Sequence, residues 1–110
     1  MLTMVIEETS QGATVLRCSG RIVKGEGADT LFRTVKSARE PHIQIELSEV
    51  SGIDAAGLGT LAELELWARN GNRTIQLMNP STRVRGALDV TRLGSVLQIC
   101  PSHPHCREAA

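Results

Sequence analysis

Ile43-Gln-Ile-Glu-Leu47 opens the most regular part of the sequence, and Val50-Ser-Gly-Ile-Asp54-Ala-Ala-Gly57-Leu-Gly-Thr-Leu61 follows it. The first run alternates apolar and polar residues, which predicts a strand with one buried face. Residues 48–56 are predicted to form a loop. Beyond them the apolar side chains recur at helical spacing, at Leu58, Leu61, Leu64 and Ala68. Asn70-Gly71 is a typical helix stop, so the stretch predicts one strand, one loop and one amphipathic helix.

Similar alternation continues on both sides of this stretch. Strands are expected at 2–7, 14–19, 74–78 and 96–100, and helices at 28–38 and after Asn79-Pro80, taken as N-cap and first helical residue. A loop is expected at 20–27. Strands that alternate with helices predict an α/β domain over 1–100, with a mixed, mostly parallel sheet and an antiparallel N-terminal hairpin. Polar residues recur on one strand face, which predicts helices mainly on the other: Gln44, Glu46, Gln76 and Gln98.

Composition excludes several classes of function. The 110 residues carry 12 basic and 12 acidic side chains and only two aromatic ones, Phe32 and Trp67. A balanced charge gives no net electrostatic attraction to nucleic acid. Two aromatic residues are also too few for the stacked platforms that bind single-stranded nucleic acid. No apolar run approaches the roughly 20 residues that cross a bilayer, so direct membrane insertion is not expected. Three cysteines form no paired framework, which favours a cytoplasmic protein with reduced thiols.

The stretch 43–100 resembles a STAS domain, the fold of bacterial anti-sigma factor antagonists. Its sharpest motif is Asp54-x-x-Gly57-Leu58, between a strand and a helix, and Gly20-Arg21-Ile22 also fits the family's opening. The resemblance covers residues 1–100. It implies a protein-interaction module whose partner is an anti-sigma factor with a histidine-kinase-like ATPase domain. By binding that partner, the module would regulate a sigma factor.

The motif also has a direct physical interpretation. Asp54 stands where a helix begins, so its carboxylate can accept hydrogen bonds from the first-turn amides and favour the positive end of the helix dipole. Gly57 and Gly59 permit close approach of a backbone or a partner, at a cost to helix stability. The alternative is that Asp54 is only a cap and that the glycines only ease packing.

The family resemblance also implies a phosphorylation site, and this chain departs from it. The usual pattern is Asp, Ser or Thr, Ser, Gly, and the second hydroxyl residue commonly receives the phosphate. Here those positions are Ala55 and Ala56, which carry no hydroxyl and cannot be phosphorylated. Ser51 and Ser48 are substitute acceptors, or ordinary loop serines. The sequence thus predicts an antagonist-like domain without phospho-control, held in its binding-competent state.

A partner surface is expected on the second helix and the loop before it. Gly59, Ala62 and Leu66 fall opposite the apolar stripe at about 100° per residue. Together with the loop they form the candidate partner-binding set: Ser51, Asp54, Ala55, Ala56, Gly57, Gly59, Ala62 and Leu66. Isolated exposed leucines are common, so the alternative is an ordinary solvated face. Trp67 borders the apolar stripe and is expected to pack half-buried.

Four residues near the C-terminus could bind zinc by chemistry alone: Cys100, His103, His105 and Cys106. Their spacing matches no common zinc site, so residues 101–110 are interpreted as a flexible tail with no metal. No cofactor is implied. The sequence also shows no nucleophile paired with a base, so catalysis is not expected.

Two other functions remain open. The domain could be the STAS subunit of a bacterial lipid-transport ABC system, where the partner is an ABC ATPase and the complex is stable. It could also be a small-molecule-sensing STAS domain that binds a nucleotide or a lipid.

Overall fold

The computed structural model describes residues 2–9 and 12–100. Strands alternate with helices along the chain, as predicted. The elements are β1 (Leu2–Glu8), β2 (Ala13–Ile22), α1 (Glu26–Lys36), β3 (His42–Ile53), α2 (Ala55–Asn70), β4 (Thr74–Met78), α3 (Thr82–Thr91), the 3-10 turn η1 (Leu93–Ser95) and β5 (Gln98–Cys100).

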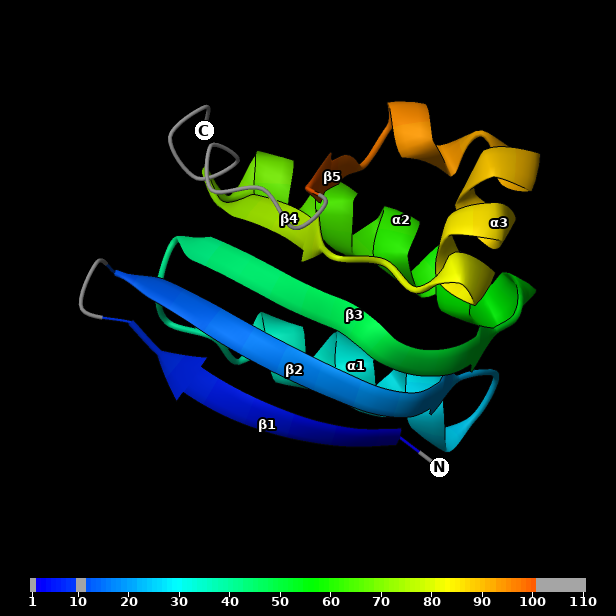
Figure 1. The fold of residues 1–110 in the computed structure, drawn as a ribbon. Helices are drawn as coiled ribbons and strands as arrows, with labels where there is room; N and C mark the ends of the chain where they lie inside the picture. The colour runs from blue at the N-terminus through cyan, green and yellow to red at the C-terminus, as the bar shows by residue number, and fades with distance from the viewer. Residues whose placement is uncertain (1, 10–11, 101–110) are drawn as a thin grey trace.

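The strands form a single five-stranded sheet in the order β1-β2-β3-β4-β5 (Figure 1). β1 pairs antiparallel with β2, and every later pair is parallel. Gly12 lies in the turn between the first two strands with a φ of 77°, a conformation that side-chain-bearing residues rarely adopt. The predicted mixed sheet with its antiparallel N-terminal hairpin is therefore confirmed.

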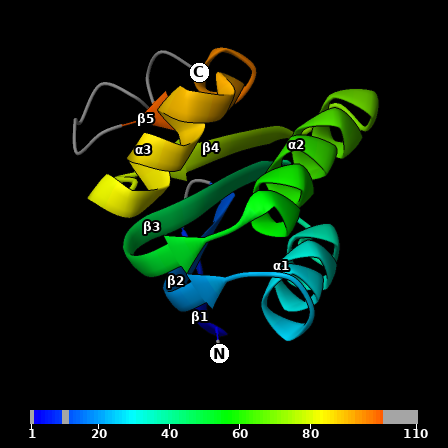
Figure 2. The same cartoon turned by 90° about the vertical axis from the view of Figure 1, so that its right-hand side faces the viewer.

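α1 and α2 cover one face of the sheet, and α3 lies on its other side, where it contacts β3 (Figure 2). The prediction of helices mainly on one face is thus confirmed. Apolar side chains of β2 and β3 alternate into the layer under α1 and α2, where Leu16, Ile43, Ile45 and Leu47 are buried. They meet the predicted apolar stripe of α2, since Leu58, Leu61, Leu64 and Ala68 are all buried. This core fixes the orientation of the α2 N-terminus.

Two predicted loops were wrong, because β2 and β3 are longer than their alternation indicates. β2 extends to Ile22 and β3 to Ile53, through residues predicted as loops at 20–27 and 48–56. The ladder between them shifts register twice, at Arg17/Ser19 and at Gly20/Arg21. A bulge of this kind interrupts the period of two while cross-strand pairing continues. Pairing over these residues brings the ends of β2 and β3 together beside α2.

The start of α3 also differs from the prediction. Ser81, not Asn79, is the N-cap: its Oγ accepts a hydrogen bond from the Val84 amide at 3.3 Å. The same hydroxyl donates to the carbonyl of Val50 at 2.7 Å, which ties α3 to β3. Pro80 precedes the helix, and Asn79 adopts a left-handed φ of 49°. The fold therefore starts the helix two residues later than Pro80 indicates.

β5 begins at Gln98 rather than at Val96. The amides of Val96 and Leu97 both donate to the carbonyl of Leu93, at 2.9 Å, so these residues close η1 instead of joining the sheet. Within the described part of the chain, no helix has the length and apolar character that crossing a membrane requires. The predicted tail, 101–110, lies outside the described residues.

Candidate functional site at the junction of β3 and α2

Asp54 joins two segments that are distant in sequence. One carboxylate oxygen, Oδ1, accepts a hydrogen bond from the Gly57 amide at 2.9 Å, which caps α2 as predicted. The other, Oδ2, accepts from the Lys24 amide at 2.9 Å, in the connection between β2 and α1. These backbone hydrogen bonds favour the charged form and hold the pKa of Asp54 below its ordinary value of 3.8. A single side chain therefore sets the relative position of two loops.

Gly57 is needed because the end of β2 passes directly against α2. A Cβ at this position would overlap the carbonyl oxygen of Ile22 and lie 2.8 Å from Cγ1 of Ile53. Gly59 is different, since a Cβ there would meet no atom within 4 Å. Close packing thus explains the glycine at position 57, but it does not explain the glycine at position 59.

The tip of the junction is the first turn of α2. It carries the methyl groups of Ala55 and Ala56 rather than hydroxyl groups. Ala55 is exposed and Ala56 is half-buried, in the first turn of α2. The neighbouring hydroxyls already make hydrogen bonds: Ser51 Oγ donates to the Gly20 carbonyl at 3.2 Å, and Thr60 Oγ1 to the Ala56 carbonyl at 3.0 Å. Ser51 is nevertheless exposed, so its hydroxyl is accessible from solvent.

The outer face of α2 continues from this tip along the helix. Gly59 and Ala62 are half-buried, and Leu66, two turns on, leaves 61% of its surface exposed. Leu66 therefore gives this face of the helix an exposed apolar side chain next to small residues. Trp67 is half-buried against the core, as predicted, and the Arg73 guanidinium lies 4.7 Å from its ring centroid.

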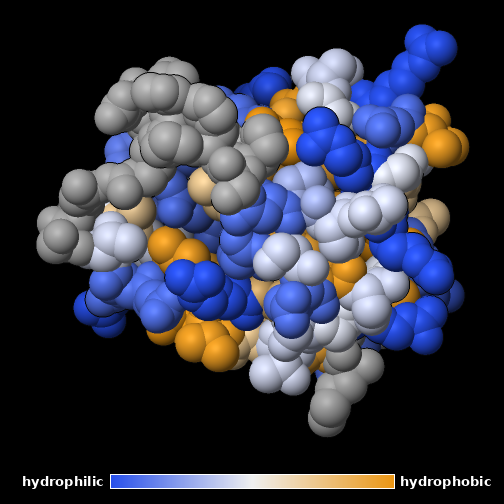
Figure 3. Space-filling model, in the orientation of Figure 1, coloured by the Kyte–Doolittle hydropathy of each residue, from blue (hydrophilic) through white to orange (hydrophobic). Residues whose placement is uncertain are grey.

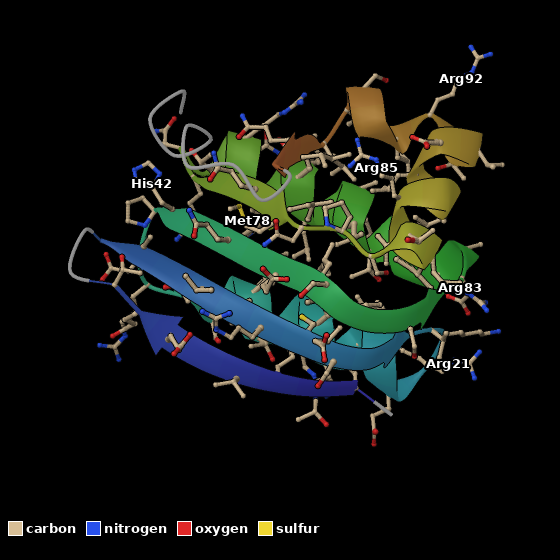
Figure 4. All side chains as sticks on the ribbon, viewed as in Figure 1. Arg21, His42, Met78, Arg83, Arg85 and Arg92 are labelled. Atoms are coloured by element: carbon tan, nitrogen blue, oxygen red, sulfur yellow. The ribbon has the colours of Figure 1, made fainter. Side chains whose placement is uncertain are left out.

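Basic residues outside the candidate partner-binding set lie near the junction. Arg21 lies one residue before the end of β2, opposite Gly52, and Lys24 follows in the connection to α1. Both side chains are exposed, as is that of Arg83 in the first turn of α3. Figure 4 shows Arg21 and Arg83 at the same end of the molecule. The sequence signal that could have identified Arg21 is Gly20-Arg21-Ile22. This run fits the opening of the family pattern, but it was predicted to be part of a loop.

A comparison with family models gives the decisive match. The family described as "Mlab, STAS domain" matches residues 6–98, which include the whole junction. The chain belongs to the STAS domain family. A comparison with curated proteins finds no match.

Solved structures agree on the STAS fold. A candidate anti-sigma factor antagonist from Thermotoga maritima gives a TM-score of 0.81 at 19% identity, over 96% of this chain and 92% of that one. An anti-sigma factor antagonist from Mycobacterium paratuberculosis gives 0.79 at 20% identity, over 99% and 93%. A sulfate transporter family protein from Wolinella succinogenes gives 0.76 at 20% identity, over 94% and 87%. At these identities the likeness is one of fold.

The predicted partner-binding residues of this STAS domain lie along the end of β3 and along α2. Ser51 lies near the end of β3, Asp54 caps α2, Ala55 to Gly59 form the first turn and a half of α2, and Ala62 and Leu66 lie farther along the helix. The candidate zinc ligands cannot be placed in the same way. His103, His105 and Cys106 lie outside the described residues, as does the side chain of Cys100.

Proposed function

We propose that this STAS domain is a cytoplasmic protein-interaction module of the anti-sigma factor antagonist type. It binds an anti-sigma factor that has a histidine-kinase-like ATPase domain, and so regulates a sigma factor. The observation that carries the proposal is the Asp54 carboxylate, held by the amides of Gly57 and Lys24 at 2.9 Å each. A binding surface that is ordered before contact loses less conformational entropy on association.

The proposed surface combines this junction with the outer face of α2. Ala55 is exposed at the tip, and Leu66 offers a large apolar side chain on the same helix. Gly59 adds open space between them, at a cost of about 1 kcal/mol of helix propensity relative to alanine. No packing contact offsets that cost within the described chain, which supports a role in contact with another molecule.

The binding module is proposed to act without phosphorylation at the usual positions. Ala55 and Ala56 stand where the family carries hydroxyl residues, and an alanine methyl cannot accept a phosphoryl group. Binding is therefore steric and reversible, and it depends on the amount of partner rather than on a kinase reaction.

The first experiment is affinity capture from a lysate of the source cell, with the wild-type domain and two matched variants as baits. Leu66→Asp places a charge on the proposed surface, and Val90→Asp places it on α3, at a valine that is 85% exposed. Mass spectrometry should find a histidine-kinase-like ATPase with wild type and Val90→Asp, and about tenfold or more less with Leu66→Asp, as expected of a contact residue. Equal capture by the three baits would contradict the proposed surface.

A second arm tests the absence of phospho-control. The captured partner is incubated with ATP and either wild type or Ala56→Ser, which restores a hydroxyl at the family's acceptor position. Intact-mass measurement should show no added phosphate on wild type. A phosphate on Ala56→Ser, with release of the partner, would show that the missing hydroxyl alone accounts for the lost control. Phosphate on wild type at Ser51 would contradict the proposal.

A second candidate function is favoured by the family match itself. Its description is "Mlab, STAS domain" and does not name anti-sigma factor antagonists. A STAS subunit of a bacterial lipid-transport ABC system would bind an ABC ATPase stably through the same helix. Capture of an ABC ATPase that survives extended washing would assign this function and exclude the first.

A further inference from the structure

Among residues 2–9 and 12–100, β1 is the outer edge of the sheet. In this part of the chain it pairs with β2 alone, through a regular ladder of seven residues that has no register shift. The strand also lacks proline. Natural edge strands usually avoid pairing with another chain by proline, bulges, short length or charge. Of these protections β1 has only the charges of Glu7 and Glu8, and both stand at its C-terminal end.

The middle of this edge is apolar. Val5 and Ile6 are 54% and 56% exposed, although they lie side by side in a strand. In Figure 3 hydrophobic surface appears along the lower border of the molecule, where Figure 1 places β1. Met4 is partly buried against the core, and Ile6 shares its face because strand residues alternate. The core therefore runs to the sheet edge, where no other described segment covers it.

The pattern of charges favours antiparallel over parallel pairing of β1 with a second copy of itself. Antiparallel pairing of the whole of β1 with the β1 of another copy centres on Val5 and sets it opposite the same residue of that copy. Ile6 then faces Met4 of the second copy, so the two cores meet across the new pair. Glu7 and Glu8 face Thr3 and Leu2. Parallel pairing would instead align the two acidic pairs, and like charges directly opposite each other are destabilising.

We infer that β1 pairs antiparallel with β1 of a second copy of this chain, joining two five-stranded sheets into one ten-stranded sheet. The pairing satisfies the free backbone groups of both edges and covers Val5 and Ile6 together. β2 separates β1 from β3, which leads to the Asp54 junction. A dimer would therefore leave both partner surfaces open, and the inference does not depend on the proposed function.

Sedimentation equilibrium of the whole chain over a range of concentrations tests the pairing. Wild type should show a reversible monomer–dimer equilibrium. Val5→Lys sets two lysines opposite each other at the centre and should raise the dissociation constant about tenfold or more. Val90→Lys is the matched control, since it adds the same charge at an exposed valine of α3 and should leave the constant unchanged. A monomeric wild type, or a dimer equally sensitive or insensitive to both substitutions, would overturn the inference.

Cross-linking tests the register even if Val5→Lys does not fold. Val5→Cys is made in a chain with Cys100→Ser and Cys106→Ser. The register places the two Cα atoms of position 5 about 4.5–5.5 Å apart, within the span of a disulfide. Glu8→Cys is the control on the same strand, because its two copies would be about 20 Å apart. Oxidation should cross-link the first variant rapidly and not the second; equal rates would overturn the inferred register.

Discussion

Gly57 and Gly59 are two residues apart in one helix, yet the structure gives them opposite roles. A Cβ at Gly57 would overlap the Ile22 carbonyl oxygen, whereas a Cβ at Gly59 would reach nothing within 4 Å. Gly57→Ala should lower the free energy of unfolding by about 1–3 kcal/mol, as overpacking does. Gly59→Ala should raise it by about 1 kcal/mol, because alanine restores helix propensity.

Urea denaturation of the two variants and wild type measures both shifts, and the same substitution in the same helix makes each variant the control for the other. Changes of the same sign in both would contradict the packing described here. The sequence alone could not separate these glycines, because the difference depends on Ile22, which is 35 residues away and on another element.

For Asp54, the sequence predicted one of the two hydrogen bonds of the carboxylate and missed the other. Its capping of α2 follows from its place before a helix, and the prediction was confirmed by the hydrogen bond to Gly57. The second hydrogen bond, from the Lys24 amide, was not predictable from local pattern. Lys24 follows an extended β2 that the alternation did not reveal, so the contact depends on tertiary pairing.

The link that Asp54 makes between α2 and the β2–α1 connection should depend on pH. Two backbone amides favour its charged form in the folded chain, so its folded pKa lies below 3.8. The stabilisation is then complete above the unfolded value and is lost as the pH falls through the folded value. Wild type should be more stable than Asp54→Asn at neutral pH, and the difference should shrink below about pH 4.

Thermal unfolding of both proteins from pH 7 to pH 2.5 measures this difference. Asp89→Asn removes another exposed carboxylate, on α3, and is the control for a general loss of negative charge. A gap between wild type and Asp54→Asn that stays constant over the acid range would show that the charge does not contribute.

The sequence predicted which strands and helices exist, but it did not predict where several of them begin or end. The periods of two and 3.6 follow from one buried face, and the core of β3 and α2 confirms them. The ends depend on contacts that leave no periodic signal. β3 is extended by pairing with β2 through two register shifts, and α3 is capped by Ser81, whose hydroxyl donates to the Val50 carbonyl. Local preference at Asn79-Pro80 could not indicate that contact.

Across the whole molecule, the central strands should open only when the entire fold opens. Cys18 lies on β2, between β1 and β3, and is 2% exposed under the α1 and α2 layer. Burial raises the pKa of its thiol to about 12, and only a thiolate reacts with disulfide reagents. In a chain with Cys100→Ser and Cys106→Ser, the labelling of Cys18 at neutral pH should therefore be slow and limited by unfolding.

Adding Gly57→Ala to that chain makes the prediction quantitative. Gly57 contacts Ile22 at the end of β2, four residues along the strand from Cys18, so the substitution is expected to act on labelling through the stability of the fold. If the fold opens as one unit, the labelling rate should rise by about tenfold for each 1.4 kcal/mol of stability lost in urea denaturation. A Cys18 labelling rate that Gly57→Ala leaves unchanged would mean that β2 becomes accessible by local opening. The slope of labelling rate against stability thus measures whether the junction at α2 and the middle of the sheet belong to one cooperative unit.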